Sequence, residues 1–424
     1  MRRRIASKRT LPALLAAAAL VAGAAACSAS AGTGGTTGAG AAGTQAGTKA
    51  PLVIGISLSL TGDFGDTGKA AEKGYELWAS QVNKSGGILG RQVQLKIVDD
   101  TTSATQVVTN YESLINEDHV DLVFGPVSSL LTVPAARVAA RYGYAFIEPA
   151  GGAPTVFALH LHNLFLAQPA PVLDLGVSFA DYILSLPPSQ RPKTAAYSSV
   201  DNPFASPVVE VVRQKLQAAG IKTVLDQTYP AEQADLGPVV ARVVAAKPDL
   251  VVDGTQGEDG YETIRDFVQQ KFSPKILFMP NDASDPVNFP AQVGLGNVDG
   301  IFTADDWSPM ASRPGNADFI KAYLAAYGGT AGQIDPTSAE AYACGQLLQE
   351  VAQKTGKVDN ATIISTLHAG TFATIEGSLS WDADGATDGT SGLLLQWINH
   401  ALVPVFPAAD AAHAPEIAKP AWGG

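Results

Sequence analysis

The chain has 424 residues, of which 46% are hydrophobic and 16% are charged, a globular composition that is long enough for two domains. Its net charge is −12, but residues 1–26 hold five basic and no acidic side chains, so the rest of the chain has 23 basic against 40 acidic residues and a net charge of −17. An acidic surface of this kind repels phosphate backbones and anionic lipid headgroups. The composition therefore argues against nucleic acid as a partner and against broad electrostatic docking on a membrane.

The first 26 residues have the pattern of a lipoprotein signal peptide. A basic segment precedes the apolar run Leu11–Ala22, which is too short to span a bilayer, and a run of small residues leads directly to Cys27. We expect Cys27 to be lipidated; an ordinary cleavage site with a chance cysteine is the alternative. Residues 27–50 are, after the cysteine, almost entirely Ser, Ala, Gly and Thr, which predicts a flexible linker. We therefore expect an exported protein that a lipid anchor holds at the extracytoplasmic face of the cell membrane.

Strands and helices alternate in two successive units along the rest of the chain. In the first unit, apolar runs predict strands at 52–60, 92–98, 121–124 and 144–147, and helical spacing predicts helices at 69–84, 103–116 and 129–142. The second unit has the same plan, with strands predicted at 194–197, 222–226, 249–253 and 275–279 and helices at 172–186, 208–219, 236–246 and 261–271. This alternation predicts an α/β fold with parallel sheets and helices on both faces.

A third stretch follows the two units. It has a predicted strand at 301–304, helices at 317–327, 337–354 and 360–367, and a hairpin of 377–381 with 393–399. The final residues, from 408 onward, are rich in Ala and Pro, and we expect them to be peripheral.

Three loops of the first unit, 61–68, 125–128 and 148–154, follow predicted strands and lie at one edge of the sheet. Ligands bind at this edge in parallel sheets. Ser128 and Ser129 stand where a helix begins, and the free N–H groups and dipole of a helix N-terminus favour an anionic group. We interpret these serines as half of a ligand pocket; the alternative is that one of them only caps the helix.

Several segments together resemble one known family. They are GISLSLTGDFGDTGK (55–69), NKSGGILGR (83–91), the Asp pair at 99–100, FGPVSS (124–129) and FIEPAGGAP (146–154). In this order and spacing they resemble the branched-chain amino-acid-binding proteins of ABC importers, the leucine/isoleucine/valine-binding type with the type I periplasmic-binding fold. The resemblance implies two doubly wound parallel-sheet lobes, joined by three crossover segments, that close on a ligand. It implies a first lobe of residues 52–168 plus 305–377, a second lobe of 172–301 plus 380–405, and a C-terminal tail of 406–424.

The resemblance also implies where a ligand carboxylate would bind. The family uses a Ser hydroxyl after G-P-x-x and groups of the loop after the next strand. The matching positions are Ser129 with its neighbour Ser128, and Ala150 to Gly152 including Gly151. Gly152 stands where the family usually has Thr, so one hydroxyl is missing. Ser129 as a helix cap remains the alternative.

In the second lobe, the family aromatic that covers the ligand falls at Phe204, and the acid that binds the ammonium group falls near Asp282. Core packing of Phe204 and a solvated surface position for Asp282 are the alternatives. Two further family aromatics fall at Thr67 and at Thr255 or Gln256, which are polar. We therefore expect a solute that is more polar than leucine, or differently shaped.

The sequence does not indicate a catalytic, phosphate-binding or metal-binding site. The sequence has no Gly-x-Ser-x-Gly, no phosphate-binding Gly-x-x-x-x-Gly-Lys and no His-Glu-x-x-His. His160 and His162 have no acidic or Cys partner nearby in sequence, and acidic pairs such as 99–100 and 305–306 are interpreted as solvated loop ends. We expect no metal and no cofactor.

The leading hypothesis is a monomeric, membrane-anchored solute-binding protein, not an enzyme, that binds a small molecule such as an amino acid and delivers it to ABC permease subunits. A ligand sensor of the same fold and, less favoured, a secreted α/β enzyme are the alternatives.

Overall fold

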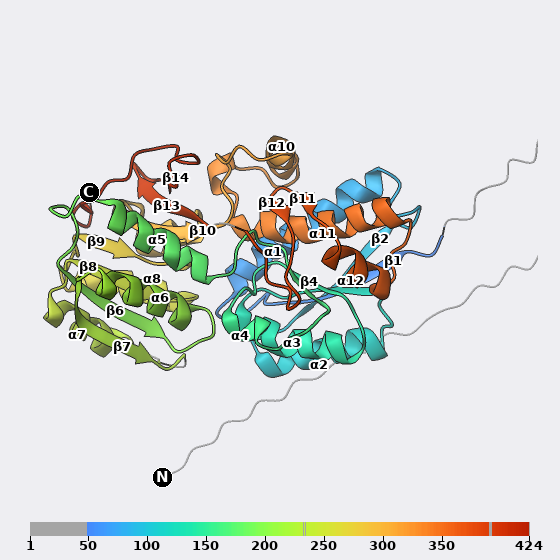
Figure 1. The fold of residues 1–424 in the computed structure, drawn as a ribbon, viewed down its shortest axis with the longest axis horizontal. Helices are drawn as coiled ribbons and strands as arrows, with labels where there is room; N and C mark the ends of the chain where they lie inside the picture. Colours follow the sequence, from blue (N-terminus) through green and yellow to red (C-terminus); the bar gives the residue numbers. More distant parts are fainter. Residues whose placement is uncertain (1–48, 232, 234, 390–391, 424) are drawn as a thin grey trace, which may run out of the picture. The chain divides into compact units, whose positions relative to one another are not determined.

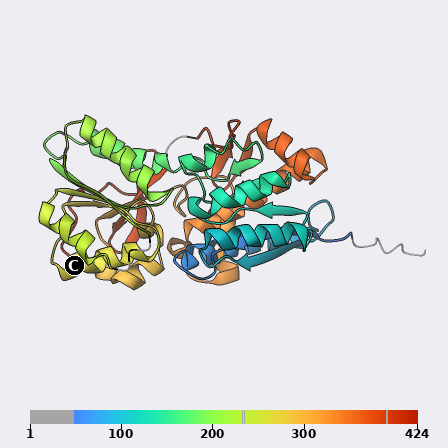
Figure 2. The same ribbon diagram turned by 90° about the horizontal axis from the view of Figure 1, so that it is seen from below.

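The computed structural model describes residues 49–231, 233, 235–389 and 392–423, which belong to one unit, Thr48–Gly424. The predicted signal peptide, Cys27 and almost all of the linker 27–50 lie outside the described residues. Two sheets form the centres of two lobes, and each sheet has helices on both faces (Figures 1 and 2). The predicted α/β fold class is confirmed.

The first lobe has a five-stranded, all-parallel sheet in the order β2-β1-β3-β4-β5. Its strands are β1 (Leu52–Leu58), β2 (Val93–Asp99), β3 (Leu122–Phe124), β4 (Phe146–Glu148) and β5 (Leu164–Leu166). Its helices are α1 (Gly65–Lys84), α2 (Ala104–Asn116), α3 (Ser129–Arg141), α4 (Pro154–Phe157), α10 (Asn316–Tyr327), α11 (Pro336–Thr355) and α12 (Asn360–His368). A small hairpin of β11 (Phe372–Thr374) and β12 (Gly377–Leu379) completes this lobe.

Helix α1 packs along α11, which returns from a distant part of the chain. Glycines permit this close approach, because a Cβ on Gly74 would lie 2.1 Å from the Ser338 carbonyl oxygen and a Cβ on Gly345 would lie 2.0 Å from the Trp78 ring. The Ser338 hydroxyl also donates a 2.7 Å hydrogen bond to the Ala70 carbonyl. The contact holds the first turns of both helices at one end of the lobe.

The second lobe has a seven-stranded mixed sheet in the order β14-β13-β10-β9-β8-β6-β7. Its strands are β6 (Thr194–Val200), β7 (Lys222–Tyr229), β8 (Leu250–Gly254), β9 (Ile276–Phe278), β10 (Ile301–Asp305), β13 (Leu393–Ile398) and β14 (Ala401–Phe406). Strand β13 is antiparallel to both β10 and β14, and the other pairings are parallel. The helices are α5 (Leu173–Ser185), α6 (Ala205–Ala218), α7 (Gly237–Ala246), α8 (Glu258–Gln269) and α9 (Asn288–Val293), with 3₁₀ turns η1 (Asp282–Ser284) and η2 (Leu295–Asn297).

The described chain passes between the lobes after β5, after β10 and between β12 and β13 (Figure 1). The crossover segments touch one another, since a Cβ on Gly389 would lie 1.5 Å from the Pro169 carbonyl oxygen. A buried 2.7 Å hydrogen bond from Gln168 Nε2 to Glu340 Oε1 ties the first crossover to α11. These contacts join the crossover segments to each other and to α11.

The structure corrects two expectations for the C-terminal part. Residues 377–381 and 393–399 do not form a hairpin with each other, because β12 pairs with β11 and β13 pairs with β14. The segment 380–389, expected in the second lobe, contacts the first lobe, where Trp381 Nε1 donates to the Leu166 carbonyl at 2.7 Å. The tail is mostly exposed, as expected, and is attached to the second lobe where Trp422 Nε1 donates to the Phe272 carbonyl at 2.6 Å.

No helix in the described part of the chain is long and apolar enough to cross a membrane.

Candidate ligand-binding site

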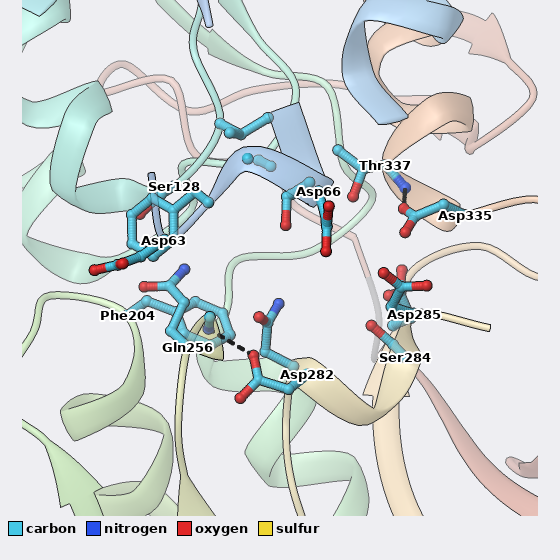
Figure 3. Close-up of a pocket in the computed structure, with 18 of the residues that line it drawn as sticks. Asp63, Asp66, Ser128, Phe204, Gln256, Asp282, Ser284, Asp285, Asp335 and Thr337 are labelled. Carbon is cyan, nitrogen blue, oxygen red and sulfur yellow. Dashed lines mark hydrogen bonds between the residues drawn. The ribbon is translucent and has the colours of Figure 1, made fainter. Parts of the chain in front are cut away.

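A cavity of about 370 Å³ lies between the lobes and is lined from both of them (Figure 3). The first lobe contributes the loop between β1 and α1, the start of α3, and the first turns of α1 and α11. The second lobe contributes the loops that follow β8, β9 and β10. The cavity therefore lies at the carboxyl ends of the parallel strands of both sheets, as expected for a doubly wound fold.

The loop after β1 is held rigidly over the cavity. The Thr61 hydroxyl donates to Asp99 Oδ2 at 2.7 Å, and the Phe64 N–H donates to Thr102 Oγ1 at 3.1 Å. Gly62 has a φ of +81°, a conformation that glycine adopts readily. Thr67, one of the predicted site residues, lines the cavity from the first turn of α1.

The two serines have different environments. Ser128 is the N-cap of α3 and lines the cavity; its Oγ accepts a 3.3 Å hydrogen bond from the Leu130 N–H. Its φ of +74° is unusual for a non-glycine residue, and backbone strain of this kind costs about 1–3 kcal/mol and concentrates at functional sites. Ser129 is fully buried and its Oγ accepts from the Ala153 N–H at 3.2 Å, so Ser129 supports the neighbouring loop from behind the cavity wall.

In that neighbouring loop, only Ala150 of the three predicted residues lines the cavity. Gly151 is required for packing, because a Cβ there would lie 2.5 Å from Thr132 Oγ1 and 2.6 Å from Glu148 Oε2. Gly152 packs against Leu166 and the first crossover. Burial raises the pKa of Glu148 to about 8, although the Ala150 and Gly151 N–H groups oppose the rise.

In the second lobe, Phe204, Gln256 and Asp282 line the cavity, whereas Thr255 is fully buried behind them. Asp282 is 6% exposed, so the alternative of a solvated surface position is wrong. Its Oδ1 accepts a 2.8 Å hydrogen bond from the Gly257 N–H (Figure 3). Burial and the charge of Asp259 raise the pKa of Asp282 well above its usual range.

The sequence family described as periplasmic binding protein matches residues 51–399. The chain belongs to the periplasmic binding protein family. Members of this family are extracytoplasmic ligand binders and not enzymes, which confirms those two predictions. The predicted resemblance to the leucine/isoleucine/valine-binding type is confirmed by individual relatives.

The Leu/Ile/Val-binding protein homolog 7 of Brucella melitensis is 23% identical over 394 residues, which cover 88% of this chain and 96% of the relative. Among solved structures, a solute-binding protein of an ABC transporter from R. palustris in complex with benzoate has a TM-score of 0.73 at 21% identity, covering 88% of this chain and 99% of its own. A branched-chain amino acid transporter substrate-binding protein from Streptococcus pneumoniae in complex with isoleucine has a TM-score of 0.72 at 18% identity, covering 83% and 97%. The structural matches confirm the type I fold.

This periplasmic binding protein has an acidic cavity wall that the sequence reasoning missed. Nine carboxyl side chains line the cavity. The first lobe supplies Asp63, Asp66, Asp335 and Glu340, and the second supplies Glu258, Asp282, Asp285, Asp305 and Asp306. Lys69 is the one basic side chain among the described lining residues, and it lies 3.7 Å from Asp66.

These acids influence one another across the cavity. Burial raises the pKa of Asp285, and the charge of Asp66 from the opposite lobe raises it further. Burial and then the charge of Asp285 raise the pKa of Asp335 well above its usual range. Burial raises the pKa of Asp305 to about 6. Burial and the neighbouring carboxyl groups therefore favour the protonated, neutral forms of these side chains, whereas a bound cation would favour their charged forms.

The expectation that the acidic pairs 99–100 and 305–306 are solvated loop ends is wrong for the second residue of each pair. Asp306 is 2% exposed and lines the cavity. Asp100 is likewise fully buried, where it accepts hydrogen bonds from Ser57 and Ser59. An acidic pair that directly follows an apolar strand was the available clue, because that position lies at the binding edge of the sheet.

Proposed function

We propose that this protein is the solute-binding component of an ABC importer and captures a small polar solute, an amino acid or a related compound, between its two lobes. The observation that carries the proposal is the cavity lined by loops from the carboxyl ends of both sheets. Relatives named as Leu/Ile/Val-binding proteins and as ABC-transporter solute-binding proteins support it.

Capture and closure are the same event in this arrangement. The loops on either side of the cavity approach closely, since a Cβ on Gly257 of the second lobe would lie 3.0 Å from the Asp63 carbonyl oxygen of the first. A solute that contacts both walls stabilises the closed form over the open one, and the crossovers provide the hinge. Permease subunits would then receive only the closed, loaded protein.

Within the cavity we assign direct solute contacts to Thr67, Ser128, Ala150, Phe204 and Gln256. Ser128 lies at the N-terminus of α3, which suits a polar or anionic group of the solute, and Phe204 covers its carbon skeleton. We assign supporting roles behind the wall to the remaining predicted residues, which are Ser129, Gly151, Gly152 and Thr255. Asp282 holds the Gly257 loop through its hydrogen bond from the Gly257 N–H.

We further propose that Cys27 carries the lipid anchor and that residues 27–50 let the protein reach a permease in the same membrane. Mass spectrometry of the N-terminal peptide from the membrane fraction should find a lipid-modified Cys27. A Cys27→Ser variant should leave that fraction. Wild-type protein with an unmodified Cys27 would contradict the anchor without affecting solute binding.

The decisive test of function is identification of the solute. Native mass spectrometry of the purified protein should detect a bound small molecule, and titration calorimetry with that compound should give 1:1 binding to a monomer. Cells that lack the gene should take up the compound more slowly. Measured turnover of the compound, or normal uptake without the gene, would contradict the proposal.

A further inference from the structure

The acidic side chains of the cavity wall indicate a narrower class of solute than the polar solutes of the proposed function. This inference rests on the proposed function. We propose that the cleft takes an organic polycation, a small solute with two or more ammonium or guanidinium groups. The branched-chain amino acids and benzoate that relatives bind carry at most one positive charge, so this proposal separates the protein from them.

Two groups of carboxyl side chains carry the argument. The first acid cluster consists of Asp66 on α1, Asp285 after η1 and Asp335 before α11, which are directed toward the same part of the cavity (Figure 3). Asp66 and Asp335 belong to the first lobe and Asp285 to the second, so this cluster spans the cleft. A cation placed between them contacts both lobes at once, and its attraction to their carboxylates favours the closed form.

The second acid cluster consists of Asp305, Asp306 and Glu340 and lies where the chain crosses between the lobes. Asp306 is 2% exposed, and its Oδ1 has no hydrogen-bond partner among the described residues. Glu340 is 4% exposed and accepts one hydrogen bond from Gln168. A buried carboxylate without enough partners is costly, so such a group holds a proton until a cationic donor pairs with it.

The protein supplies few counter-charges of its own. Among the described residues, Asp66 is the one lining acid with an ion-pair partner, Lys69, and both side chains of that pair are about half exposed, at 42% and 56%. Arg313 lies close enough to influence the second cluster, but its guanidinium is bonded to Glu376. A cationic solute would therefore supply the counter-charge that the described wall lacks.

An organic cation fits better than a metal ion. The described residues contain no group of three or more His, Cys, Asp or Glu side chains arranged to hold a metal. The cavity volume of about 370 Å³ accommodates a molecule, and Phe64, Phe204 and Tyr261 in its wall can pack against a carbon chain or lie over an ammonium group. Two separate acid clusters match at least two cationic centres on one solute.

The test is titration calorimetry of the purified protein with spermidine, putrescine, L-leucine and benzoate. We expect spermidine and putrescine to bind at least about 10-fold more tightly than L-leucine or benzoate, with affinity that falls as salt increases. Asp285→Asn should weaken spermidine binding about 10-fold. Asp66→Asn should do the same, and this second variant is included because Asp66 is more exposed and tolerates substitution. Asp410→Asn, a substitution of the same type on the exposed tail, should leave it unchanged.

The remaining outcomes separate this inference from the proposed function. Tight binding of L-leucine or benzoate with no binding of the diamine or triamine would overturn the polycation assignment and leave solute capture intact. Spermidine binding that both cleft variants leave unchanged would also overturn it, because the cation would then bind elsewhere. If no compound binds and native mass spectrometry finds no bound small molecule, both the inference and the proposed function fail.

Discussion

Gly257 offers a direct test of lobe closure. Its φ is +104°, and a Cβ at this position would lie 3.0 Å from the Asp63 carbonyl oxygen across the cleft. Gly257→Ala therefore has two effects. The backbone strain of alanine, about 1–3 kcal/mol, is present in the open and closed forms alike. The contact with Asp63 exists only in the closed form.

The effect of the Asp63 contact on solute affinity can be calculated. A contact that forces neighbouring atoms apart by a few tenths of an ångström costs about 1 kcal/mol, at the low end of overpacking effects. If only the closed form bears this cost, solute affinity falls about 5-fold, since 1.4 kcal/mol corresponds to a factor of ten. Calorimetric titration with the identified solute measures this change directly.

Gly220→Ala is the matched control. Gly220 also has a positive φ, +88°, but no atom lies within 4 Å of its would-be Cβ. This variant should lose stability through backbone strain and keep wild-type affinity. If Gly257→Ala lowers the melting temperature but binds the solute as tightly as Gly220→Ala does, the Asp63 contact plays no part in the bound state and the closure reasoning is refuted.

Three further predictions concern stability. Burial raises the pKa of Glu148 from 4.5 to about 8, so the stability contributed by its protonated form is fully present below about pH 4.5 and is lost as the pH rises through about 8. Glu148→Gln should flatten this loss of stability in thermal melts. An equal loss in the variant and in wild type would contradict the prediction. Trp381→Phe removes the hydrogen bond to the Leu166 carbonyl and should lower the free energy of unfolding in urea by about 1–2 kcal/mol, whereas an unchanged midpoint would show that the bond is not needed. Trp422→Ala should cost about 1–2 kcal/mol because its bond to Phe272 O holds the tail on the second lobe, and the same urea titration would expose an error if the variant matched wild type.

Much of the fold could be predicted because the strands and helices follow simple periodicity. The buried strands β1 and β8 begin with continuous apolar runs, and the helices that follow them have one apolar face. Helix α1 begins earlier than expected, at Gly65, because the glycines of this segment read as loop. Gly68 lets α1 pack closely against the end of β1, because a Cβ at this position would lie 1.8 Å from the Ser59 carbonyl oxygen.

Pairing across long sequence distances could not be predicted from local pattern. The turn-rich stretch between 377–381 and 393–399 favours a hairpin of the two segments, but the hydrogen bonds of β12 are made with β11. The second lobe has the antiparallel β13 and β14 beside its parallel strands, an arrangement that depends on the whole chain.

The candidate site was predictable in its loops but not in its charge. The loops that contain Thr67, Ser128 and Ala150 meet at the cavity as a parallel sheet requires. Each lining acid, taken alone, resembles an ordinary polar residue at a loop or helix end. Their convergence follows from bringing together segments that lie as far apart in the chain as Asp66 and Glu340.

The docked C-terminal segment has a practical consequence for measuring motion. The described chain enters through β1 in the first lobe, and its last residues are held on the second by the Gly423 N–H to the Gly296 carbonyl, a 3.0 Å bond. The two ends thus belong to different lobes. A pair of fluorophores, one just before β1 and one at the C-terminus, would follow the hinge in real time without a label near the solute.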